Sequence, residues 1–244
     1  MLPPTYASKT GTIEPEDPAA YFHERLHRWG AEHMRAFPWR STTDPYQVLI
    51  AEMMLRRTQA RQVVPVYHRF LTQYPTVHHL VRAQQADIEV LLRPLGLAWR
   101  VANIIDLARQ IVSRHNGRIP AERASLLALA GVGDYVASAV RCLAFAAPET
   151  LVDTNTVRVA GRYFGFVTDA ESRRKRGVRE AVGALIDPAA PRDANLTLLD
   201  FAALICRATR PLCARCPVAQ KCSWYREHVC DHGSTPGENN AANT

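Results

Sequence analysis

Apolar residues recur at three- and four-residue spacing along most of this chain, which is the period of a helix that buries one face. No stretch of useful length alternates β-branched and polar residues as a strand does. Pro75, Pro94, Gly96 and Gly117 divide the pattern into short segments. The sequence therefore predicts an all-α protein of about ten short helices. Helices are expected over residues 19–34, 46–58, 63–74, 76–82, 86–93, 100–116, 121–130, 135–143 and 155–163.

The composition of the 244 residues excludes several classes of protein. Hydrophobic residues make up 47%, which is ordinary for a globular protein, and no apolar run reaches the roughly 18 residues of a membrane span. Residues 1–18 and 231–244 are rich in Pro, Gly, Ser and Asn, so both ends are expected to be disordered. The N-terminus lacks the basic and apolar regions of an export signal, which predicts a cytoplasmic protein without membrane contact.

The charge of the chain favours a polyanionic partner. The formal net charge is +7, and basic residues gather in a few segments of the sequence. For the run at residues 173–179 a solvated helix start is the favoured interpretation. For Arg207 and Arg210, which lie in a short loop between cysteines, contact with a phosphate and plain solvation are equally open.

Four cysteines near the C-terminus have the spacing C-x6-C-x2-C-x5-C, and they are Cys206, Cys213, Cys216 and Cys222. Three interpretations compete. Disulfides are disfavoured because a reducing compartment keeps thiols free. Structural zinc usually takes two closely spaced cysteine pairs, and only one such pair is present here. A [4Fe–4S] cluster fits the spacing best, since it accepts four thiolates from loops of this length. Cys142 is expected to be buried and inert, and Cys230 has no evident role.

A glycine pair separates two of the predicted helices. Residues 126–129 end one helix, Gly131, Val132 and Gly133 form a tight turn, and the next helix begins at Tyr135. Such a turn exposes amide N–H groups at a helix N-terminus, where a phosphate binds readily, while Val132 fills the gap between the helices. An ordinary corner between two helices is an equally common explanation of the pattern.

An acidic residue follows this hairpin by 20 residues. Asp153 lies between apolar Val152 and Thr154, at the start of the helix predicted over 155–163. Taken alone, Asp153 is as well explained by capping that helix as by chemistry. The order of hairpin, aspartate and four cysteines along one chain favours a catalytic carboxylate.

Together these segments resemble the helix-hairpin-helix DNA glycosylases that carry an iron–sulfur cluster, the superfamily of endonuclease III and the MutY-type adenine glycosylases. LAGVGDYVASAV resembles the hairpin, VDTNTVR the segment of the catalytic aspartate, and FPWR with DPYQVLIAEMMLRRTQA the first part of the family's six-helix domain. The resemblance implies a six-helix domain over 46–151 and a cluster domain built from 19–45 and 152–230, with a DNA cleft between them. It also implies a [4Fe–4S] cluster, double-stranded DNA with a mismatched or damaged base as partner, a nucleoid-associated location in the cytoplasm, and a monomer.

Tyr135 separates the branches of this family. Bifunctional members carry a lysine at this position, two residues after the second hairpin glycine, and that amine forms a Schiff base. A tyrosine resembles the Mig-type enzymes, which remove thymine or uracil opposite guanine by hydrolysis alone. A MutY-type adenine glycosylase is the alternative, although the chain ends soon after the cysteines where such enzymes continue into a further domain. A non-catalytic protein that binds DNA damage is a second alternative.

The resemblance assigns roles to single residues. Asp153 is expected to stabilise the positive charge that develops on the sugar, and Asn155 either orients Asp153 or its helix or is an ordinary residue of the first helical turn. Glu52 contacts the departing base or water, or else pairs with an arginine. Tyr135 contacts the flipped base or forms a wall of the cleft.

The remaining assignments concern DNA contacts. Arg57 and Leu97 are candidates to fill the gap that the flipped base leaves, unless they are a surface charge and a core leucine. The amides of Gly131 and Gly133 are expected to bind a phosphate.

Overall fold

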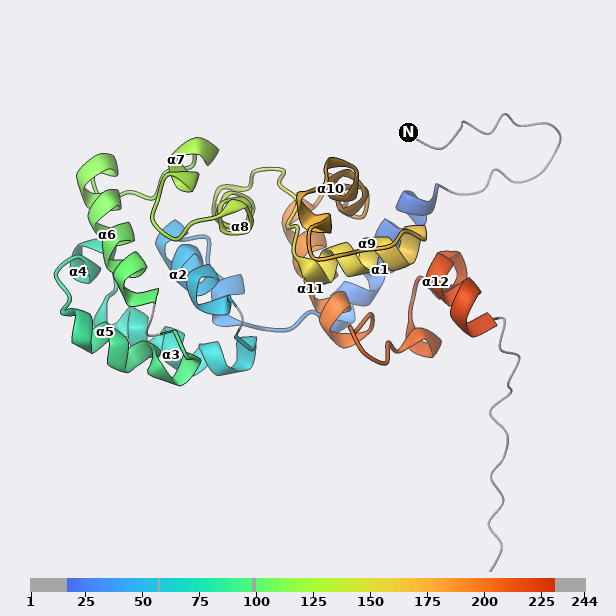
Figure 1. The fold of residues 1–244 in the computed structure, drawn as a ribbon, viewed down its shortest axis with the longest axis horizontal. Coiled ribbons are helices and arrows are strands. Elements are labelled where there is room, and N and C mark those ends of the chain that lie inside the picture. Colours follow the sequence, from blue (N-terminus) through green and yellow to red (C-terminus); the bar gives the residue numbers. More distant parts are fainter. Residues whose placement is uncertain (1–16, 57, 98–99, 231–244) are drawn as a thin grey trace, which may run out of the picture.

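The computed structural model describes residues 17–56, 58–97 and 100–230, and within that part every regular element is helical (Figure 1). The predicted all-α class is confirmed. The described α-helices are α1 (Pro18–His33), α2 (Pro45–Leu55), α3 (Ala60–Gln73), α4 (Val77–Leu80), α5 (Gln85–Leu92), α6 (Val101–His115), α7 (Arg123–Leu127), α8 (Asp134–Phe145), α9 (Thr154–Phe164), α10 (Arg176–Gly183), α11 (Pro191–Leu204) and α12 (Ser223–Tyr225). Short 3₁₀ turns η1 (Pro38–Arg40) and η2 (Arg93–Leu95) lie between them, and a π-helical turn (Arg226–Cys230) follows α12.

Most helix positions follow the hydrophobic pattern, with differences at the ends. The helix predicted over 46–58 stops at Leu55, and the one predicted over 121–130 is reduced to Arg123–Leu127. In both cases the sequence remains compatible with a helix, but the backbone turns into a loop next to the hairpin. The starts of α1, α2 and α9 are set locally, because Asp17, Asp44 and Asp153 each cap the following helix with a side-chain oxygen.

Buried apolar side chains form two clusters. The first core joins α2, α3, α5, α6 and α8, and it contains Leu49, Phe70 and Leu107. The second core joins α1, α9, α10 and α11, and it is built around Phe22 and Phe201. The predicted boundaries of the two domains remain a prediction. Phe37 and Trp39 belong to the predicted cluster domain by their position before residue 46, but their side chains pack in the first core.

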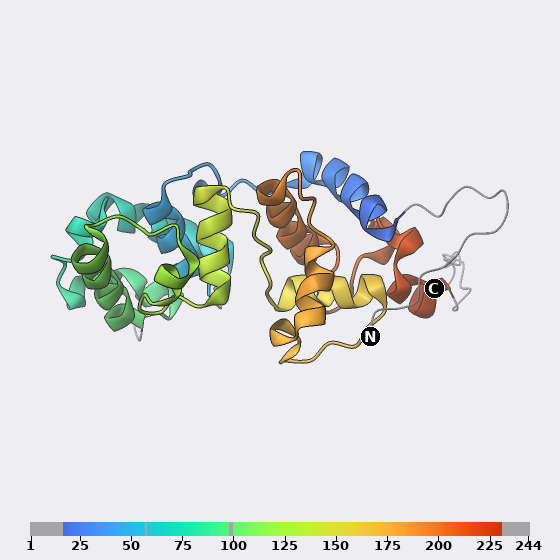
Figure 2. The same cartoon turned by 90° about the horizontal axis from the view of Figure 1, so that it is seen from above.

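The two halves of the molecule are joined by two connections, which both views show (Figures 1 and 2). One connection runs from α1 to α2 through residues 34–44, and the other runs from α8 to α9 through residues 146–153. α11 is the helix of the second half that packs against α8. The start of α9 therefore lies where the two halves meet, and that is where Asp153 is located.

None of the helices in the described part of the chain has the length and hydrophobicity that a bilayer-spanning segment needs.

Candidate active site and cysteine cavity

Asp153 is held at the first turn of α9 by a reciprocal set of hydrogen bonds. Its Oδ1 accepts from the backbone N–H groups of Asn155 and Thr156, both at 2.8 Å. Its own N–H donates to Thr156 Oγ1 at 3.0 Å, which completes a capping box. The second oxygen, Oδ2, accepts from Asn155 Nδ2 at 2.7 Å. The helix-cap explanation of Asp153 is therefore correct, and the half-buried carboxylate remains available to act on a substrate as well.

Glu52 on α2 is a buried acid whose pKa is influenced by the charge of Asp153. Its side chain is 5% exposed, and Oε2 has no hydrogen-bond partner among the described residues. Burial raises the pKa of Glu52 from 4.5 to about 7, the Arg40 guanidinium opposes this shift, and the Asp153 carboxylate adds to it. The protein therefore maintains a carboxyl group that gains and loses a proton near neutral pH.

Tyr135, in the first turn of α8, completes this group. Burial raises the pKa of the Tyr135 phenol well above its ordinary value, and the charges of Glu52 and Asp153 raise it further. The phenol is thus neutral at physiological pH. Three sequence-predicted residues, from α2, α8 and the N-cap of α9, thus lie near enough for their charges to interact, although 101 positions separate the first from the last.

Arg40 is a site residue that the sequence analysis missed. Its guanidinium forms two parallel hydrogen bonds to Asp200, at 2.7 and 2.9 Å, and Arg35 also donates to that carboxylate. Asp200 is fully buried, and although burial alone would raise its pKa, the hydrogen bonds from Arg40 and Arg35 bring that pKa below its usual value. The positive charge beside Glu52 is therefore fixed in place. The only signal in the sequence was the FPWR segment, which carries no indication that Asp200 is its partner.

The hairpin needs glycine at one of its two positions for steric reasons. Gly131 has a φ of +75°, and a Cβ there would come within 2.9 Å of Met53 Cε. A Cβ at Gly133 would meet nothing within 4 Å, and Gly133 caps α8 without any side-chain acceptor for its first N–H groups. Val132 is buried in the first core, as predicted. Steric crowding therefore requires glycine at 131 but not at 133, and the open surroundings of Gly133 leave room for a ligand at the helix start.

The residues predicted to contact DNA differ in their exposure. Arg207 and Arg210 are exposed, and Arg207 Nη2 donates to the Arg210 carbonyl at 3.0 Å, which stiffens the loop that carries them. Leu97 is 4% exposed within the first core. The core-leucine interpretation is thus the correct one for its position, because filling a gap in DNA would require it to leave this packing. Arg57 lies outside the described residues.

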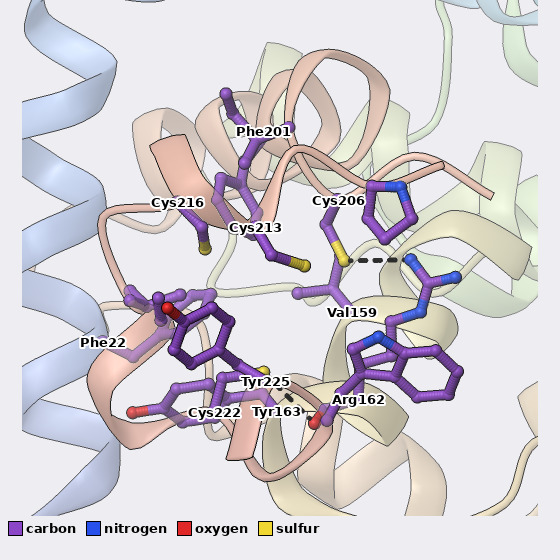
Figure 3. A pocket seen from close by; sticks show the side chains of 15 residues that line it. Phe22, Val159, Arg162, Tyr163, Phe201, Cys206, Cys213, Cys216, Cys222 and Tyr225 are labelled. Atoms are coloured by element: carbon purple, nitrogen blue, oxygen red, sulfur yellow. Dashed lines mark hydrogen bonds between the residues drawn. The ribbon is translucent and has the colours of Figure 1, made fainter. Parts of the chain in front are cut away.

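The four cysteines line one mostly apolar cavity between α9, the end of α11 and the segment before α12 (Figure 3). Arg162 on α9 donates to Cys206 Sγ at 3.5 Å, and Cys222 Sγ donates to the Arg162 carbonyl at 3.4 Å. Burial raises the pKa of the Cys216 thiol to about 12. All four are free cysteines. Within the described ranges, no three His, Cys, Asp or Glu side chains come together tightly enough for a single metal ion.

Arg158 joins this cavity to the catalytic segment, and it too was missed. Its Nη1 donates to Asn155 Oδ1 at 3.0 Å, and its Nε donates to the Cys206 carbonyl at 3.1 Å. Since Asn155 in turn donates to Asp153, one continuous chain of hydrogen bonds runs from the cysteine loop to the candidate catalytic acid.

A tight glycine turn between two helices, followed by a carboxylate at the start of a later helix in a two-part helical protein, is the arrangement expected of the helix-hairpin-helix DNA glycosylases. A family model described as HhH-GPD superfamily base excision DNA repair protein matches residues 50–183. The chain belongs to this family.

Two sequence relatives and one solved structure indicate which members of this family the chain resembles. The chain is 36% identical over 200 residues to a thymine/uracil-DNA glycosylase of Methanothermobacter thermautotrophicus, covering 82% of this chain and 90% of the relative. It is 40% identical over 193 residues to a thymine-DNA glycosylase of Aeropyrum pernix, covering 77% and 86%. The solved structure of a thermostable thymine-DNA glycosylase matches with a TM-score of 0.80 and 34% identity, covering 86% of this chain and 97% of that one. These relatives confirm the prediction that the protein is a DNA-binding DNA N-glycosylase.

Proposed function

We propose that this protein removes thymine or uracil mispaired with guanine, by hydrolysis of the N-glycosidic bond and without strand cleavage. The observation that carries the proposal is the neutral phenol of Tyr135 beside Glu52 and Asp153, at the position where bifunctional relatives have a lysine. The names of the thymine/uracil relatives support the same substrate class.

The reaction follows from the charges at the site. As the bond between C1′ and the base N1 breaks, its electron pair leaves with the base and positive charge develops on the sugar. The Asp153 carboxylate stabilises that charge. Water then adds to C1′ and gives up a proton to the Asp153 carboxylate, while the departing thymine or uracil, which leaves as an anion, takes up a proton from solvent. The protonated form of Glu52, which is well populated at neutral pH, is suited to donate a hydrogen bond to a carbonyl oxygen of the departing base.

Nothing in this group performs the lyase step of the bifunctional relatives. That step needs an amine that forms a Schiff base with C1′. A phenol has no nitrogen and cannot form the imine. The hydrolytic product, an abasic site in an intact strand, is therefore the expected end point.

The first test is a glycosylase assay on duplexes with one T·G, U·G, A·8-oxoguanine or T·A pair. We expect strand breaks at T·G and U·G only after alkali, and no borohydride-trapped covalent complex. Action on A·8-oxoguanine alone would assign the protein to the adenine glycosylases. Breaks without alkali would contradict the monofunctional mechanism, and inactivity on all four duplexes would favour a protein that only binds damage.

Flipping the target base out of the duplex costs a few kcal/mol, and this cost is lowest at a mismatch. A mismatched thymine or uracil is therefore easier to flip out than a paired one.

The amides of Gly131 and Gly133 are proposed to bind a phosphate near the target. The exposed arginines Arg207 and Arg210 are proposed to bind the backbone from the cysteine loop, and the protein is proposed to act as a monomer.

We further propose that Cys206, Cys213, Cys216 and Cys222 hold a [4Fe–4S] cluster, which relatives such as endonuclease III and the adenine glycosylases typically carry. The four thiols share one apolar cavity, which suits the residues to this group. Structural zinc usually takes two closely spaced cysteine pairs, and Cys213 with Cys216 is the one such pair among the four, so the spacing favours a cluster over zinc. The cluster would crosslink the segment between α11 and α12 to itself, and no step of the reaction needs it.

Replacing Cys206 by serine is expected to remove the broad absorbance at about 400 nm that such a cluster gives. It should also lower the unfolding temperature by about 10 °C, because the loop loses its crosslink. Absorbance and thermal unfolding of the purified protein test both effects. Cys142→Ala is the matched control, since Cys142 lies in the first core and should leave the absorbance intact. Stoichiometric zinc in a colourless wild-type protein would contradict the proposal.

A further inference from the structure

Asn195 on α11 is a buried polar residue that reaches across to the connection between α8 and α9. It is 1% exposed. Its Nδ2 donates to the Glu149 carbonyl at 2.8 Å and to the Pro191 carbonyl at 2.7 Å, while its Oδ1 accepts from the Leu151 N–H at 2.8 Å. Both ends of the carboxamide are thus occupied. Such a complete set of hydrogen bonds fixes the backbone it binds.

Both backbone polar groups of Leu151 are hydrogen-bonded to side chains. Asn195 holds its N–H, and Thr156 Oγ1 donates to its carbonyl at 3.0 Å. The same Thr156 hydroxyl accepts from the Asp153 N–H at 3.0 Å. Leu151 is fully buried, so its backbone polar groups have no access to water and depend on these partners. Asp153 follows two residues later. The backbone position of Asp153 is therefore fixed by Asn195 on α11, through Leu151, and by Thr156 on α9.

α11 also holds the other connection between the halves. Asp200, five residues after Asn195, binds Arg35 and Arg40 in the segment between α1 and α2. One helix thus fixes both crossings of the chain, which Figure 1 shows on either side of α11. Because Glu52 and Tyr135 belong to the first half, the position of Asp153 relative to them depends on these two attachments.

We propose that Asn195 is a positioning residue for the reaction, which sets the Asp153 carboxylate against Glu52 and Tyr135. This inference rests on the proposed function of Asp153. A catalytic group displaced by about 1 Å loses up to 10²-fold in rate, although the fold is unchanged. The backbone hydrogen bonds of Asn195 act on the segment that determines this displacement.

The titratable groups around Asn195 determine how an aspartate at this position would respond to pH. The titratable groups near it are Cys142, Glu149 and Arg192. The Cys142 thiol is neutral, because burial raises its pKa. Burial by itself would raise the pKa of Glu149, but hydrogen bonds from Arg141 and Ser138 lower it overall, so Glu149 is ionised and paired. An aspartate at 195 would face two backbone carbonyl oxygens, and it would therefore hold its proton to unusually high pH.

The experiment measures single-turnover cleavage of a T·G duplex and affinity for a duplex with a non-hydrolysable abasic-site analogue. Asn195→Ala is expected to lower the rate by about 10- to 100-fold while the affinity stays within about threefold. Asn195→Asp should recover rate as the pH falls toward 6, because the protonated acid again donates to a carbonyl and accepts from the Leu151 N–H. Protonation of Glu52 also affects the wild-type rate in this range, so the quantity to compare is the ratio of the variant rate to the wild-type rate, which should rise as the pH falls.

Thr197→Ala is the matched control. Thr197 is another buried polar residue of α11, but it packs against Gly30 of α1, where a Cβ would come within 2.5 Å of its Cγ2. We expect this variant to lose thermal stability with no change in rate. A folded Asn195→Ala protein with wild-type rate, or an equal loss in Thr197→Ala, would overturn the inference. If Asp153→Asn keeps its activity, the proposed function itself fails instead.

Discussion

Replacing Asp153 by asparagine is expected to abolish base excision while the protein stays folded. Loss of a preorganised group that stabilises transition-state charge typically costs about 10²- to 10³-fold in rate. Asparagine caps a helix about as well as aspartate does, and its Oδ1 can accept from the same N–H groups of Asn155 and Thr156. The substitution therefore removes the charge and keeps the cap. Single-turnover excision from a T·G duplex, together with thermal unfolding, measures both.

Asp153→Ala separates the two roles of the residue. Alanine removes both the charge and the capping oxygen, so its activity should match that of Asp153→Asn. Its free energy of unfolding should be lower by about 1 kcal/mol. If Asp153→Asn keeps more than about a tenth of the rate, an effect smaller than that expected of such a group, the carboxylate serves only as a cap.

Glu52→Gln is expected to make the protein more stable at alkaline pH. The folded-state pKa of Glu52 is about 7, against an ordinary value of 4.5. Between these values the folded protein keeps a proton that the unfolded chain releases. The contribution of Glu52 to stability is therefore fully present below pH 4.5, falls as the pH rises, and reaches its lowest level above pH 7. The total change is on the order of 3 kcal/mol.

Glutamine imitates the protonated acid at every pH, so the variant escapes this loss. Urea unfolding of both proteins from pH 4.5 to 8 should give equal stabilities at the acidic end and a growing advantage of the variant toward pH 8. The difference between the two proteins isolates Glu52, because all other titrating groups are shared. A difference that does not vary with pH would mean that Glu52 has an ordinary pKa. A buried acid that costs stability at working pH is typical of a functional site.

The contrast between Asp153 and Asp200 shows what sequence reasoning finds and what it misses. Asp153 was found because its helix, its cap and the preceding hairpin are local features with fixed spacing. Asp200 is as deeply involved in the site, through Arg40, but its partners lie 160 and 165 positions away. No local period or spacing carries that pairing. Arg158 and Asn195 escaped notice for the same reason, since their hydrogen bonds join segments about 45 residues apart.

The hydrophobic period, the caps and the cysteine spacing by themselves determined that the chain is helical, where most helices begin, and that four cysteines lie close enough along the chain to share one site. These features depend on neighbours within about two turns of chain, and local sequence encodes them. Only the tertiary structure decided that Leu97 is a core residue, that Gly133 is free of steric demand, and that Arg40 stands beside Glu52. Burial and the pKa shifts that follow from it arise where distant segments pack together, and the energy of such packing is set by three-dimensional contacts that a linear pattern does not contain.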